Sequence, residues 1–128
     1  MGVPAFDDSE WPILRVTFDV SISQPEVDDY LARCAEFLTR RERIGLLIDA
    51  RKADVPDAKT RARFVEFFDV QRPRTRRYIA GMSVVLRTAM GRGVVTAVTW
   101  MESPSFPVKS FEHAGEARLW LKDLLSAH

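Results

Sequence analysis

Residues 44–49 read Ile-Gly-Leu-Leu-Ile-Asp, a short and nearly continuous apolar run that ends on an acidic residue. A run of this length without alternating polar residues is typical of a parallel strand that is covered on both faces. We therefore predict that these residues form a central strand of a parallel sheet, with their carboxyl end marked by Asp49.

Strands and helices alternate on both sides of this run. Alternating apolar residues predict one strand before it, and apolar residues at helical spacing predict four helices in all. The expected elements are a strand at 11–18, a helix from about 24 to 40, the strand at 44–49, a helix from about 58 to 71, a strand at 78–86, a helix at 88–101, a strand at 106–111 and a helix from 114 to about 124. The order β-α-β-α-β-α-β-α predicts an α/β fold with one largely parallel sheet of four or five strands and right-handed crossovers.

The chain of 128 residues is long enough for one compact core and too short for two. Residues 1–10 are expected to form a flexible arm, and residues 11–128 a single domain. Pro73 is expected to end the preceding helix by about Gln71, because the residue before a proline disfavours helical geometry. The segment from Arg72 to Arg77 is then expected to be an exposed loop.

Several function classes are disfavoured by composition. No apolar run approaches the roughly 18 residues that span a bilayer, and no secretory leader is visible, so a cytoplasmic location is expected. One cysteine, Cys34, and two histidines are too few for a thiolate or imidazole metal cage, so we expect no metal and no cofactor. Cys34 lies on the apolar stripe of its helix and should be buried and unreactive rather than paired with His113 in a catalytic dyad.

Two stretches carry a resemblance to a known family. The first is Leu46-Leu47-Ile48-Asp49 leading through Asp57 into a helix; the second is Pro107-Val108, then Phe111-Glu112 and the helix from Ala117 to Leu121. These stretches resemble the STAS domain, the fold of bacterial anti-sigma-factor antagonists, and more closely the broader STAS-like (SpoIIAA-like) group. The resemblance implies a regulatory or scaffolding module that acts by binding another protein.

The family's phosphorylation switch is not expected in this chain. In the family an Asp-Ser-Ser-Gly pattern opens the helix after the central strand. Aligned from Asp49 without gaps, Asp57 takes the place of the family's Asp, and Ala58 and Lys59 take the places of the serines. Thr60 is one residue out of register. What the resemblance still implies is a partner-binding surface at the start of this helix, formed by Arg51, Asp57, Lys59 and Thr60, with Asp57 as a cap.

A second candidate site lies at the same carboxyl edge of the sheet, where ligands of parallel sheets commonly bind. It comprises Arg87, Thr88, Arg92 and His113. Two helix starts with nearby arginines could hold an anion, although the short Gly91-Arg92-Gly93 turn lacks the Lys-Ser/Thr ending of a phosphate-binding loop. The simpler interpretation is that these four residues are ordinary solvated loop residues.

Charge is distributed unevenly: residues 1–42 carry 4 basic and 9 acidic groups, whereas residues 59–77 carry 7 and 2. Arg72, Arg74, Arg76 and Arg77 form a second basic patch at the amino edge of the sheet. A formal net charge of only +1 makes nucleic acid an unlikely partner. The aromatic residues Phe64, Phe67, Phe68, Trp100 and Trp120 are expected to be core rather than a stacking platform.

These observations favour a non-enzymatic STAS-like module that acts through protein–protein interaction. The alternative is a domain that binds a small ligand, a lipid or a nucleotide, in a pocket at the carboxyl edge of the sheet. A homo-oligomer is compatible with either function.

Overall fold

The computed structural model describes residues 5–18, 24–53 and 57–127. These residues form five strands and five helices, which alternate except where β1 is followed by β2 and α2 by α3. In chain order these are β1 (Ala5–Glu10), β2 (Ile13–Thr17), α1 (Gln24–Leu38), β3 (Ile44–Asp49), α2 (Ala58–Val70), α3 (Arg72–Tyr78), β4 (Ile79–Val85), α4 (Ala89–Glu102), β5 (Val108–Phe111) and α5 (Ala114–Ser126). The predicted α/β alternation is confirmed, and the shared elements begin and end within about two residues of the predicted bounds.

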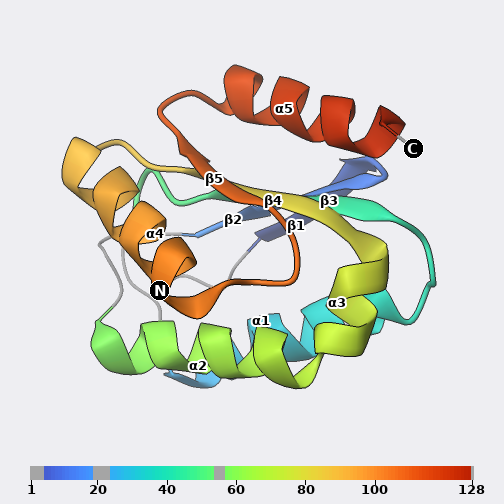
Figure 1. Ribbon diagram of the computed structural model, residues 1–128, viewed down its shortest axis with the longest axis horizontal. Coiled ribbons are helices and arrows are strands. Elements are labelled where there is room, and N and C mark those ends of the chain that lie inside the picture. Colours follow the sequence, from blue (N-terminus) through green and yellow to red (C-terminus); the bar gives the residue numbers. More distant parts are fainter. Residues whose placement is uncertain (1–4, 19–23, 54–56, 128) are drawn as a thin grey trace.

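The strands form one sheet in the order β1-β2-β3-β4-β5, in which β1 is antiparallel to β2 and all other neighbours are parallel. From β2 to β5, each new parallel strand is added on the same side of the strand before it. Since the crossovers are right-handed, the helices that connect these strands must all cover the same face of the sheet. The helix after the last strand is free to cover the opposite face. Figure 1 shows α5 alone on one side of the sheet, with α1, α2 and α3 on the opposite side.

The amino-terminal segment differs from the prediction of a flexible arm. Residues 5–10 form β1, which pairs with β2 and makes the sheet mixed; residues 1–4 lie outside the described residues. The ring of Phe6 stacks on those of Tyr30 and Phe37, and the Arg33 guanidinium lies 4.4 Å from its centroid. Phe6 packs β1 against the core, and Glu10 pairs with Arg118 of α5 at 2.9 Å. The polar residues around Phe6 conceal the strand in the sequence.

The segment from Arg72 to Arg77 is also not a loop. Pro73 does end α2, whose C-cap is Gln71, but it occupies the first turn of the short helix α3. A proline is compatible with a first helical turn because the amide that it lacks would have no helical partner there. Thr75 is fully buried and its hydroxyl lies 2.8 Å from that of Ser105, which fixes α3 against the loop before β5.

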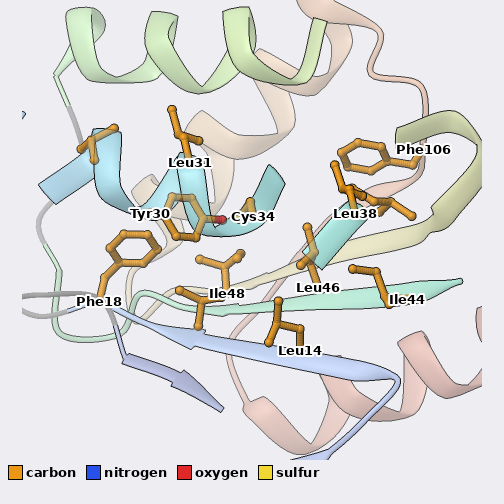
Figure 2. Packing of buried hydrophobic residues seen from close by; sticks show 13 residues of the cluster. Leu14, Phe18, Tyr30, Leu31, Cys34, Leu38, Ile44, Leu46, Ile48 and Phe106 are labelled. Carbon is orange, nitrogen blue, oxygen red and sulfur yellow. The ribbon is translucent and has the colours of Figure 1, made fainter. Parts of the chain in front are cut away.

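Side chains alternate between the two faces of the sheet, and each face has its own core. The larger core packs beneath α1 and is shown in Figure 2; its members include Leu14, Phe18, Tyr30, Leu31, Cys34, Leu38, Ile44, Leu46, Ile48 and Phe106. The smaller core packs beneath α5 and contains Ile13, Leu47, Val85, Ala117 and Leu121. We call these sides the α1–α4 face and the α5 face.

Cys34 is buried in the larger core, as predicted. Burial is the main reason that the pKa of its thiol rises to about 12, although the neighbouring Tyr30 hydroxyl favours the thiolate (Figure 2). His113 is exposed at the N-cap of α5. The thiol is accordingly expected to resist labelling in the folded protein.

Candidate functional site

A cavity of about 380 Å³ lies between the sheet, α2 and α4. Its walls are mainly aliphatic and aromatic. The sheet contributes Ile48, Met82, Val84 and Val108; α2 contributes Phe64, Val65 and Phe68; and α4 contributes Val94, Val95 and Val98. Since α4 packs mainly along β5, the space between α4 and α2 is left unfilled.

The cavity is open to solvent, and most of its lining is apolar. A molecule that covers this apolar surface removes it from water, which contributes about 25 cal/mol for each Å² covered. Binding of an apolar molecule in the cavity is therefore favourable.

Polar side chains line the cavity where it reaches the carboxyl edge of the sheet. The carboxylate of Asp57 accepts a hydrogen bond of 2.8 Å from the Thr60 amide, so Asp57 caps α2 as predicted. This hydrogen bond is the main reason that the pKa of Asp57 is lowered, with a smaller contribution from nearby Arg61 and Lys59. The Thr60 hydroxyl accepts a hydrogen bond of 2.9 Å from Gln24.

A second set of polar side chains lines the cavity toward the amino edge of the sheet. The Arg72 guanidinium lies 3.1 Å from the Asp69 carboxylate and also donates to the Ser103 carbonyl at 3.4 Å. Thr99 donates to the Val95 carbonyl of its own helix at 2.8 Å. The cavity thus has an apolar middle and two ends whose polar groups bind one another.

The four residues predicted for partner binding have different environments. Lys59 and Asp57 are exposed at the start of α2. Thr60 is only 7% exposed, contrary to the expectation that it would be accessible, because its hydroxyl points to α1 and bonds Gln24. Arg51 is exposed, but its guanidinium is engaged by Asp49.

Asp49 forms a compact ion cluster at the carboxyl end of β3. Its carboxylate accepts hydrogen bonds of 2.8 Å from Arg15 and of 2.8 and 2.9 Å from Arg51, and it is 5% exposed. Burial by itself would raise the pKa of Asp49, but the two guanidinium groups outweigh it and lower the pKa to about 2. Sequence reasoning placed Asp49 at this edge but did not identify Arg15 as its partner.

None of the residues predicted for an anion or ligand site lines the cavity. Arg87 and His113 are exposed. The Thr88 hydroxyl caps α4 by accepting from the Gly91 amide at 3.1 Å, and Arg92 donates to the Leu86 carbonyl at 2.9 Å. Only Gly91, between Thr88 and Arg92, contributes to the cavity wall.

The second basic patch lies on α3. Arg72 is paired with Asp69 and lines the cavity, whereas Arg74, Arg76 and Arg77 are exposed. The Arg77 guanidinium lies 5.6 Å from the centroid of the Tyr78 ring.

The sequence predicted a ligand pocket, as the alternative function, at the carboxyl edge of the sheet, and it did not indicate a cavity between α2 and α4. Phe64, Phe67 and Phe68 do pack against the larger core, and Phe64 and Phe68 also form part of the cavity wall. Trp120, on α5, packs against the smaller core, and the Trp100 side chain lies outside the described residues. An apolar helical stripe looks the same in sequence whether it meets another side chain or a void. Among the residues that the structure describes, no cluster of His, Cys, Asp or Glu is suited to a metal ion.

The described part of the chain contains no helix with the length and apolar character needed to cross a bilayer. No protein-family model matches the sequence, and no curated protein is detectably similar to it. A solved structure is similar in fold: an uncharacterized DUF3478-family protein from Shewanella loihica PV-4, described as having a SpoIIAA-like fold, superposes with a TM-score of 0.70 over 94% of this chain and 93% of that one, at 12% identity. The chain therefore has a SpoIIAA-like fold, in agreement with the resemblance found in its sequence.

Proposed function

We propose that this protein is a non-enzymatic binding domain that holds a small apolar molecule in the cavity between the sheet, α2 and α4. The observation that carries the proposal is the cavity of about 380 Å³ with aliphatic and aromatic walls. Pockets for small ligands commonly have volumes of about 300 to 1,000 Å³ and mainly apolar linings. The free energy gained when a ligand removes these apolar walls from water supports the same function.

Binding is favoured over catalysis by the state of the polar residues at the cavity ends. Catalytic sites present a nucleophile or base held within reach of a substrate. Here the described polar lining residues Asp57, Thr60 and Asp69 serve as a helix cap, a helix-to-helix hydrogen bond and an ion pair. These roles support a receptor or carrier rather than an enzyme.

The proposal is tested by titrating the protein with Nile red, an uncharged apolar dye. Val98→Trp places a large ring in the cavity, whereas Ala97→Trp places it on the exposed side of the same helix. We expect Val98→Trp to weaken dye binding by at least about tenfold and Ala97→Trp to leave it within about twofold. Thermal melts of both variants check that they are folded. A wild-type protein that fails to bind the dye, or equal binding by both variants, would contradict the proposal.

A second candidate function, protein–protein regulation, is supported by the exposed charge at the start of α2. Lys59 is exposed beside the start of α2, where its positive charge adds to the positive end of the helix dipole. Because Thr60 is buried, the partner surface reduces to Arg51, Asp57 and Lys59. We expect Lys59→Glu to abolish capture of a partner from the source cell, whereas Lys122→Glu, on exposed α5, should not. Equal capture by both variants would count against this surface.

A further inference from the structure

The charged residues that line the cavity are balanced at each of its ends. Arg61 stands near enough to Asp57 to lower the pKa of that carboxyl, and Arg72 is paired with Asp69. Arg61 also takes part in interactions within the protein. Each arginine that lines the cavity therefore has a carboxylate near it, and the charges of the lining residues themselves cancel at both ends. Lys59, which also lowers the pKa of Asp57, lies outside the lining.

The hydroxyl groups of the lining each make a hydrogen bond within the protein. Thr60 accepts from Gln24, Thr99 donates to the Val95 carbonyl, and Ser105 bonds Thr75. A pocket that orients a polar ligand keeps a few convergent polar groups available for it. In this cavity the corresponding groups hold the helices and the loop before β5 in place.

The apolar middle and the paired ends determine the free-energy cost of placing a ligand's charged group in the cavity. A carboxylate or phosphate that entered the apolar middle would lose its water without gaining a partner, which is costly. At either end it would have to compete with Asp57 or Asp69 for a guanidinium that is already neutralised. An uncharged apolar molecule meets neither penalty.

We infer that the cavity selects uncharged apolar molecules and discriminates against anionic and cationic amphiphiles, including fatty-acid carboxylates and nucleotides. This inference rests on the proposed function, because it specifies the ligand class of the same cavity. It also distinguishes the two ligand classes that the sequence left open: a neutral lipid fits the cavity, whereas a nucleotide does not.

The test is displacement of bound Nile red by straight-chain amphiphiles of one chain length that carry a hydroxyl, a carboxylate or a quaternary ammonium group. At neutral pH, and below micelle-forming concentrations, we expect the alcohol to displace the dye at a concentration at least about tenfold lower than either ion. The carboxylate should bind more tightly as the pH falls and it becomes neutral, while the alcohol should not change. A carboxylate that matches or exceeds the alcohol at neutral pH would overturn the inference.

A gain-of-function variant gives an independent measurement. Asp69→Asn leaves Arg72 without its carboxylate, so the ratio of carboxylate to alcohol affinity should rise several-fold, while Asp123→Asn on α5 should leave that ratio unchanged. An unchanged ratio in Asp69→Asn would overturn the role given to charge balance. If Nile red does not bind at all, the proposed function fails; if it binds but the carboxylate is preferred, only the selectivity fails.

Discussion

The two faces of the sheet differ in how closely their helices approach it. On the α5 face, a Cβ atom added at Gly45 would lie 3.1 Å from Leu121 Cδ2, and one at Gly81 only 2.5 Å from Leu124 Cδ1. Ala117 and Leu121 are completely buried there. On the α1–α4 face, Val84 and Met82 reach into open space and remain half-buried, although more helices cover that side.

This difference shows that the number of covering helices does not determine how well a face is filled. One helix seals the α5 face because glycines in β3 and β4 let it lie close to the strands. On the other face, α2 and α4 lie against larger strand residues and flank the cavity. A binding function can therefore reside on one face of the sheet while the opposite face supplies tight packing.

The strongest test of this comparison uses two adjacent valines of β4. Val85 is fully buried under α5, whereas Val84 points into the cavity. Val85→Ala should cost about 2 kcal/mol of unfolding free energy, because its neighbours lose contacts, whereas Val84→Ala should cost under about 1 kcal/mol. Urea unfolding of both variants measures this. Equal losses would mean that the α1–α4 face is as tightly packed as the α5 face.

Lowering the pH should reduce the unfolding free energy by a similar amount, because it protonates Asp49 at the carboxyl end of β3. The pKa of Asp49 is lower in the folded protein, at about 2, than its ordinary value of 3.8, so its ionised form stabilises the fold above about pH 4. As the pH falls from about 4 to 2, roughly 2 kcal/mol of unfolding free energy should be lost. Asp49→Asn should remove most of this dependence, and Asp123→Asn should retain it. The same acid slope in Asp49→Asn would show that other carboxylates are responsible.

A smaller effect on stability is expected at the start of α2, the helix whose half-buried aromatic side chains line the cavity. Since Asp57 satisfies the Thr60 amide, Asp57→Ala should lower the melting temperature by a few degrees through loss of the cap. Asp57→Asn, which keeps an oxygen acceptor, should recover most of the loss. If the two variants melted alike, charge rather than capping would be the contribution of Asp57.

The smallest effect is expected at the amino edge of the α1–α4 face. Arg74 and Arg76 are exposed on α3, so replacing both by Glu should change the unfolding free energy by less than ~0.5 kcal/mol. Thermal melts at low and high salt measure this change. A clearly larger loss would show that α3 depends on its charges, in addition to the buried Thr75–Ser105 contact.

Local pattern was enough to predict the main elements of this protein and the burial of Cys34. Periods of two and of about 3.6 residues, the cap at Asp57 and the proline at 73 are properties of neighbouring residues, and they identify most strands and helices without tertiary information. The resemblance to SpoIIAA-like proteins rested on the same local stretches. By contrast, β1 and α3 were missed because each is held mainly by distant contacts, Phe6 on Tyr30 and Thr75 on Ser105.

The candidate site could be predicted only in part. Periodicity in the sequence places Phe64, Phe68 and Val98 on the apolar sides of their helices, and it places Asp49 at the end of a central strand. The cavity between α2 and α4, and the convergence of Arg15 and Arg51 on Asp49, follow from the folded structure alone. Periodicity records which side of an element avoids water, whereas a cavity depends on the distance between elements that are far apart in the chain.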